Sequence, residues 1–103
     1  MKYQIIITDK VNEQINDIIM YIADESKSKE GALNFLGRLE EEILKLEDFP
    51  FMGVKPKYLI LKKQGYLVLV FEKYLIFYKV NKERKKVIIY AIFNSKQEYR
   101  RLI

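Results

Sequence analysis

The sequence contains neither cysteine nor histidine, and these two absences exclude several classes of chemistry. Without cysteine the chain has no disulfide and no thiol nucleophile. Without either residue type a zinc site is not expected, and catalysis by a histidine acid or base is ruled out. We therefore expect no metal and no other cofactor.

Long apolar runs are also missing. The longest, "YLVLVF" at 66–71 and "YLIFY" at 74–78, are far shorter than the roughly 18 to 20 residues that a membrane-spanning helix needs. The first ten residues, "MKYQIIITDK", hold only a very short apolar stretch before polar residues follow, unlike a secretory signal. These features predict a cytoplasmic protein with no membrane partner.

Apolar and aromatic residues are plentiful, and charge is unevenly distributed. Half of the 103 residues are apolar and 14% are aromatic, which predicts one folded domain, residues 1–103, with one core. Residues 1–51 have a charge balance of −5, whereas residues 52–103 have +10. A basic half favours an anionic partner, most commonly nucleic acid. The alternative is a lysine-rich protein that binds no anionic partner.

The first half predicts a strand followed by two helices. Residues 3–8, "YQIIIT", form a short apolar run rich in β-branched residues, which is typical of a buried strand. Asp9 and Ser28 are placed to cap the helices, and Pro50 and Gly53 to stop the second one. Apolar residues recur at helical spacing: Val11, Ile15, Ile18, Ile19 and Ile22 in the first helix, and Ala32, Phe35, Leu36, Leu39, Ile43 and Leu46 in the second.

The second half predicts a sheet. Strands are expected at 66–71, 74–80 and 87–93, with a further one beginning at 58–61. The short connections at 72–73 and 81–86 allow only antiparallel pairing. The fold class is α+β: an N-terminal strand, an αα-hairpin packed on a mostly antiparallel sheet of three or four strands, and a short C-terminal helical turn. The helices can cover only one face, so the other is expected to be a concave surface, a partner site, or both.

The last residues, "EYRRLI", have the spacing of one helical turn. Tyr99, Leu102 and Ile103 stand at i, i+3 and i+4, so their apolar side is expected to dock on the sheet while Arg100 and Arg101 point outward. Arginine offers a bidentate fork to phosphate or carboxylate, and tyrosine offers a stacking face. The tail therefore predicts a docked segment. Its arginines, with Lys96 and Tyr99, are expected to form a basic edge that contacts nucleic acid or a target enzyme; the alternative is that the arginines simply point outward.

The order of these elements and three local stretches resemble the RelE/ParE superfamily of bacterial type II toxins. Residues 20–53 resemble its ParE-type helical hairpin, with "FP" followed shortly by glycine. Residues 66–93 are similar to the family's "YR-x-L-x-V-x-x-Y-x-I-F-Y-x-V" hairpin. The ending at 98–103 resembles the "DYRRLL" that closes many members. Together these stretches cover nearly the whole chain.

The resemblance implies a toxin that a cognate antitoxin wraps and neutralises, with no small-molecule substrate. ParE-like members poison DNA gyrase, whereas RelE-like members are endoribonucleases that cleave mRNA on the ribosome. Metal-independent RNA cleavage needs a group that accepts the 2′-hydroxyl proton, cations that stabilise the phosphate, and an acid for the leaving oxygen.

This chain departs from the pattern of both branches at the expected arginines. Leu67 follows Tyr66 and Leu75 follows Tyr74, and Gln97 stands at or near the position of a third arginine. The missing cations argue against an efficient ribonuclease, and the long helical hairpin favours the ParE-like branch. We therefore expect a gyrase-directed toxin. The alternatives are a RelE-like endoribonuclease and a degenerate, non-toxic module that binds an antitoxin. A general RNA-binding protein would have the charge, but recognisable RNA-binding motifs are missing.

The candidate site residues are basic or aromatic. If the chain is an enzyme, the catalytic candidates are Lys96, Tyr99 and Arg100. The expected target-binding residues are Lys62, Lys63, Lys96, Tyr99, Arg100 and Arg101. The alternative for Lys62 and Lys63 is that they are solvated loop lysines. The basic run at 82–86 has an alternative of the same kind, because charged hairpin loops keep strands soluble.

Overall fold

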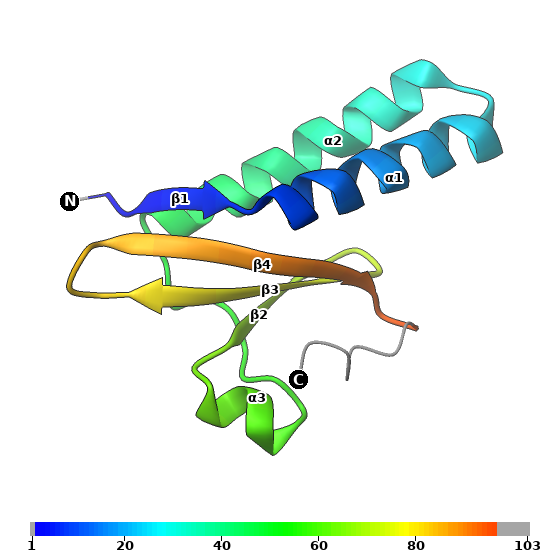
Figure 1. The fold of residues 1–103 in the computed structure, drawn as a ribbon. Helices are drawn as coiled ribbons and strands as arrows, with labels where there is room; N and C mark the ends of the chain where they lie inside the picture. Colours follow the sequence, from blue (N-terminus) through cyan, green and yellow to red (C-terminus); the bar gives the residue numbers. More distant parts are fainter. Residues whose placement is uncertain (1, 97–103) are drawn as a thin grey trace.

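A four-stranded sheet lies between two long antiparallel helices on one face and a short helix on the other (Figure 1). The computed structural model describes residues 2–96. In chain order the elements are β1 (Gln4–Ile7), α1 (Asp9–Ser26), α2 (Lys29–Leu44), the 3-10 helix η1 (Lys45–Glu47), α3 (Leu59–Lys63), β2 (Leu67–Phe71), β3 (Tyr74–Asn81) and β4 (Lys86–Asn94).

The sheet has the order β1-β4-β3-β2, with β1 parallel to β4 and the other pairs antiparallel. Both hairpin connections turn tightly: Glu72 and Lys85 adopt left-handed backbone conformations, with φ of 52° and 55°, as short hairpin turns require. The predicted α+β class, with a first strand, a helical hairpin and a mostly antiparallel sheet, is confirmed.

The helix boundaries follow from capping, with one difference from the prediction. Ser28 caps α2 as predicted, because its hydroxyl accepts from Gly31 N at 3.0 Å. Thr8, and not Asp9, caps α1, and its Oγ1 accepts from Val11 N at 3.3 Å. Asp9 stands one position later, inside the first turn of α1, where its negative charge interacts favourably with the positive end of the helix dipole.

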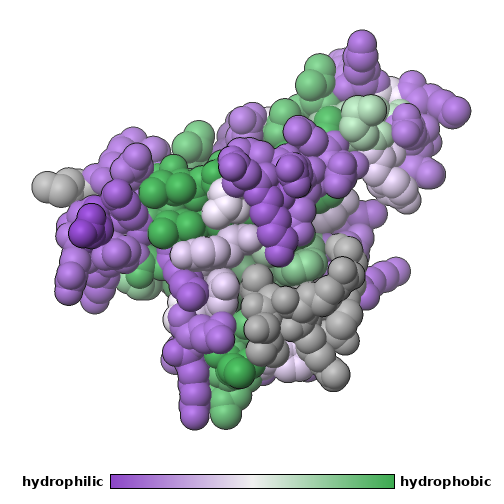
Figure 2. All heavy atoms as spheres, viewed as in Figure 1, coloured by the Kyte–Doolittle hydropathy of each residue, from purple (hydrophilic) through white to green (hydrophobic). Residues whose placement is uncertain are grey.

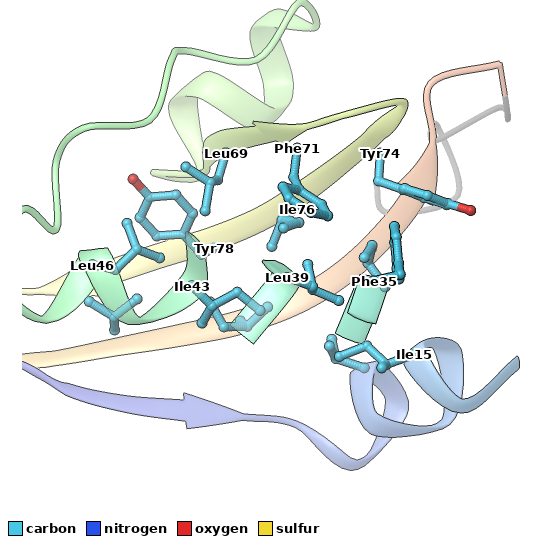
Figure 3. Packing of buried hydrophobic residues seen from close by; sticks show 14 residues of the cluster. Ile15, Phe35, Leu39, Ile43, Leu46, Leu69, Phe71, Tyr74, Ile76 and Tyr78 are labelled. Carbon is cyan, nitrogen blue, oxygen red and sulfur yellow. The ribbon is translucent and has the colours of Figure 1, made fainter. Parts of the chain in front are cut away.

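The main core lies between the helical hairpin and the sheet (Figure 3). The side chains that α1, α2 and η1 contribute were predicted from their helical spacing, and those from the sheet alternate along β2, β3 and β4. Figure 3 shows the two sets pointing toward one another: Ile15, Phe35, Leu39, Ile43 and Leu46 from the helical side, and Leu69, Phe71, Tyr74, Ile76 and Tyr78 from the strands.

The connection between η1 and α3 is fastened to the sheet at Gly53 and Val54. Gly53 N donates to the hydroxyl of the fully buried Tyr78 at 3.0 Å. Val54 forms an isolated antiparallel bridge with Val68, with two backbone hydrogen bonds of 2.8 Å on the outer edge of β2. The "FPFMG" stretch at 49–53 therefore leads onto the outer edge of β2.

The expected strand at 58–61 is wrong, because this segment begins α3. Tyr58 precedes the helix, and only Leu61 of its five residues is buried. Lysines in the last turn and Gly65 at φ 89° are the usual signals of a helix end, and they outweigh the β-propensity of a four-residue apolar run.

Part of the second sheet face, which was predicted to be a concave surface, a partner site, or both, is covered by α3. Leu61 packs there in a second cluster with residues of all three antiparallel strands and the residue before β2: Tyr66, Val68, Phe77, Ala91 and Phe93. The predicted C-terminal helical turn and its docking lie outside the described residues. Within residues 2–96, no helix is both long and apolar enough to cross a membrane.

Candidate functional site

The sheet face opposite the helical hairpin carries a lysine held between two tyrosines. Lys79 Nζ lies 4.5 Å from the ring centroid of Tyr66 and 5.4 Å from that of Tyr90. The two rings meet edge to face, with centroids 5.7 Å apart. A cation over an aromatic ring is attracted by the ring's negative face, so both rings hold the ammonium group in place. We call these three residues the lysine–tyrosine site.

Two irregularities of the backbone bring the tyrosines to Lys79. Tyr66 follows the left-handed Gly65 at the end of α3, and its N–H donates to Leu61 O at 3.1 Å. On β4 the register shifts, so that Phe77 pairs with Ala91 and Tyr78 with Ile89, which leaves Tyr90 as the extra residue of a bulge. A bulge of this kind re-aims a side chain, and here Tyr90 and Ala91 both join the second cluster.

The chemistry of this site suits binding better than proton transfer. Burial, and then repulsion from Tyr90, raise the pKa of Tyr66 above its ordinary value. Tyr66 therefore stays neutral near pH 7 and can donate a hydrogen bond, but it does not act as a base. Within the described residues the arginines are Arg38 on α2 and Arg84 in the β3–β4 turn, so the strands themselves carry none.

The surroundings of Lys79 are open and basic. A shallow hollow of about 540 Å³ lies beside it, lined by Val80, Asn81, Lys82, Glu83, Ile88 and Tyr90. The adjoining turn brings one further cation to the hollow, Lys82, whose Nζ lies 5.5 Å from the Phe51 ring centroid. Lys85 of the same turn lies instead over the Tyr3 ring, 5.2 Å from its centroid. None of the ion pairs found within residues 2–96 involves these lysines. The lining of the hollow thus holds two lysines, Lys79 and Lys82, and one carboxylate, that of Glu83.

The structure places the sequence-predicted residues in two separate regions. Lys62 and Lys63 are exposed in the last turn of α3, just before Tyr66, and thus belong to the same side of the molecule as Lys79. Lys96 is exposed beyond the end of β4, whereas Lys79 pairs with Ile88 near its start, so the two lysines are not brought together. Tyr99, Arg100 and Arg101 lie outside the described residues, and their roles stay predictions.

The lysine–tyrosine site was missed by sequence reasoning. One signal was available: Lys79 is the only charged residue in the otherwise apolar stretch 74–80. The bulge that re-aims Tyr90 has no comparable signal. Within residues 2–96 no group of histidine, cysteine, aspartate or glutamate residues is arranged to hold a metal ion.

Comparison with known proteins gives a family and a fold. A comparison with curated proteins found no match. Among solved structures, the chain is similar to one from the crystal structure of the toxin-antitoxin complex RelBE2 of Mycobacterium tuberculosis. The TM-score is 0.65 at 14% identity, covering 91% of this chain and 99% of that one. Residues 5–99 match the family "ParE toxin of type II toxin-antitoxin system, parDE". The chain therefore belongs to the ParE toxin family of type II toxin–antitoxin systems.

Proposed function

We propose that this protein is the toxin of a type II pair, that it inhibits bacterial growth by binding DNA gyrase in the cytoplasm, and that a cognate antitoxin neutralises it. Membership of the ParE toxin family supports the toxin role. The solved relative comes from a toxin–antitoxin complex, which supports an antitoxin as partner.

We choose gyrase binding over RNA cleavage because of the composition of the lysine–tyrosine site. A poison acts by holding its target, so it needs a binding surface and no proton-transfer groups. Lys79 lies between the rings of Tyr66 and Tyr90, on a sheet whose described strands include no arginine or histidine. RNA cleavage would instead need a base, an acid and several cations around one phosphate. The site therefore favours recognition of an anionic surface over cleavage.

The first test is tightly controlled expression in a bacterial host, with pulse-labelling of DNA and protein synthesis within minutes of induction. We expect DNA synthesis to fall first and the cells to become filamentous. An immediate fall in protein synthesis would favour the ribosome-dependent endoribonuclease. Normal growth while the protein accumulates would favour a binding module without toxicity.

The second test measures supercoiling by purified gyrase and assigns the effect to Lys79. Lys79→Met keeps an apolar chain of similar length but removes the charge, whereas Lys10→Met removes an exposed charge on α1, away from the site. We expect Lys79→Met to need at least about tenfold more protein for the same inhibition, the size of effect that marks an interface residue important for binding. Lys10→Met should match the wild type. Equal inhibition by both variants would contradict the role of Lys79.

A further inference from the structure

Charge in this molecule is separated between its layers. The two long helices, within residues 9–44, carry nine acidic and four basic side chains. Residues 52–94, which hold α3 and the three antiparallel strands, carry ten basic and two acidic side chains. The helical hairpin lies on one face of the sheet and α3 lies on the other (Figure 1). A polyanion is therefore attracted to the side of α3 and repelled from the helical hairpin.

A dense cluster of cations lies at the turn between β3 and β4. Residues 82–86, "KERKK", hold four basic side chains and one carboxylate. Figure 2 shows hydrophilic spheres gathered over this turn, at the left of the view. Lys82 from the turn and Lys79 from β3 both line the hollow of the lysine–tyrosine site. Lys62 and Lys63 are exposed on the same side of the molecule, at the end of α3.

The polar groups of the hollow suit a phosphate better than a carboxylate. Arginine pairs with a carboxylate through a planar fork, whereas lysine is a compact point charge and a common phosphate ligand. The cations in the lining are lysines, and the described strands hold no arginine. Asn81 also lines the hollow, and its Oδ1 accepts from Arg84 N at 3.1 Å, so the NH₂ group of this side chain is its donor. The hollow is shallow, which suits the backbone of a large polyanion better than a small ligand.

We propose that the lysine–tyrosine site binds a phosphate of the DNA that gyrase holds, with Lys79 and Lys82 as the cations that contact it. The inference rests on the proposed function, because it names the anionic group that the site recognises on the gyrase–DNA complex. The rings of Tyr66 and Tyr90 hold the ammonium group of Lys79 in place, so little side-chain freedom is lost when the phosphate binds. Glu83 in the lining repels the phosphate and limits the affinity.

The first measurement uses a short labelled DNA duplex of mixed sequence and no gyrase. Fluorescence anisotropy gives the binding constant of the full-length protein as salt is raised from about 50 to about 200 mM. Each phosphate contact contributes about −0.9 to the slope of log K against log salt. The lysines available on this side are Lys62, Lys63, Lys79 and Lys82, so we expect a slope between about −2 and −4 for the wild type.

Variants in the hollow then assign the contact. Lys79→Met should reduce the size of the slope by about 0.9 and weaken binding about fivefold to tenfold at 0.1 M salt, whereas Lys79→Arg keeps the charge and should keep the slope. Glu83→Gln should act in the opposite direction and tighten binding by about twofold. Lys10→Met is the matched control, because it removes an exposed charge on α1, and it should match the wild type. Lys82→Met repeats the test at an exposed position of the turn, and circular dichroism checks that every variant folds.

Three results would overturn the inference. The first is an unchanged salt slope in both Lys79→Met and Lys82→Met. The second is an RNA duplex of the same sequence that binds at least about tenfold more tightly than the DNA, which would assign the site to RNA. The third comes from capture of the protein on immobilised gyrase: equal weakening of Lys79→Met with and without DNA would place a carboxylate of the enzyme at the site.

The duplex assay and the gyrase assay fail independently. A wild-type protein that inhibits gyrase but does not bind the duplex would refute the DNA contact alone. A protein that binds the duplex through Lys79 but leaves gyrase unaffected would refute the proposed target alone.

Discussion

Gln14 on α1 ties the helical hairpin to the centre of the sheet through one hydrogen bond. Its Oε1 accepts from Ile92 N at 2.9 Å. β1 pairs with β4 only as far as Ile89. Ile92 lies beyond that point on β4, so β1 offers no acceptor for its N–H. Ile92 itself is 3% exposed. Without Gln14 this N–H would be a buried donor with no acceptor.

The substitution Gln14→Leu keeps the approximate volume of the side chain but removes the acceptor. An unsatisfied buried donor costs roughly 1 to 3 kcal/mol, and we expect a loss of about 2 kcal/mol in the free energy of unfolding. For a domain of this size that corresponds to a fall in Tm of about 8 to 16 °C. Gln14→Glu is the matched control, because a carboxylate oxygen also accepts from the N–H, and it should melt close to the wild type at pH 7.

Thermal and urea unfolding, followed by circular dichroism, give the stabilities of the three proteins. Native-state hydrogen exchange gives the local effect, and the Ile92 amide should exchange faster in Gln14→Leu than in Gln14→Glu. Equal stability of Gln14→Leu and the wild type, with the Ile92 amide still protected, would refute the reasoning. It would mean that another acceptor satisfies this N–H.

Two further predictions concern the connection at Gly53 and the buried tyrosines. Gly53→Ala should lower the free energy of unfolding by about 1 to 3 kcal/mol, because the added Cβ would lie 2.6 Å from Tyr78 Oη and 2.8 Å from Val68 O. Urea unfolding measures this loss, and an unchanged unfolding midpoint would contradict the prediction. Burial raises the pKa of Tyr78 above the ordinary value of 10.0, although the hydrogen bond from Gly53 acts in the opposite direction. Burial also raises the pKa of Tyr66 above that value. The unfolded chain therefore ionises these tyrosines first, so their contribution to stability is complete below about pH 10 and is lost as pH rises through the higher folded pKa values. Melting temperatures from pH 8 upward, with tyrosinate absorbance recorded in parallel, should show this loss, which would be smaller in Tyr66→Phe.

The sequence predicted most of the fold because its strongest signals are local and repeated. Helical spacing identified the buried faces of α1 and α2, and short connections fixed the antiparallel hairpins. The prediction was wrong where one signal was brief. Residues 58–61 are too few to show a period, and the helix-ending residues that decide the matter come after them, at Lys62 to Gly65. At Asp9 two adjacent residues could both cap, and Thr8 holds the capping position.

The candidate site was predictable only in part, since it depends on contacts between distant residues. Lys62 and Lys63 could be proposed from composition alone, and the structure places them on α3 close to Tyr66 in the chain. The meeting of Tyr66, Lys79 and Tyr90 depends on the turn after α3 and on the bulge in β4. Neither irregularity has a period in the sequence, so the pair of rings around Lys79 could be seen only once the strands were placed in register.

The bridge between Val54 and Val68 has a consequence for how the sheet can grow. An open strand edge on each side of a sheet would let copies join end to end into filaments. Here the hydrogen bonds of Val54 occupy the middle of the β2 edge. On the β1 edge, the outward backbone groups of Ile5 and Ile7 have no partner within residues 2–96. A strand can therefore be added at the β1 edge, whereas the bridge of Val54 blocks addition at the β2 edge. This geometry therefore resists aggregation into a continuous fibre.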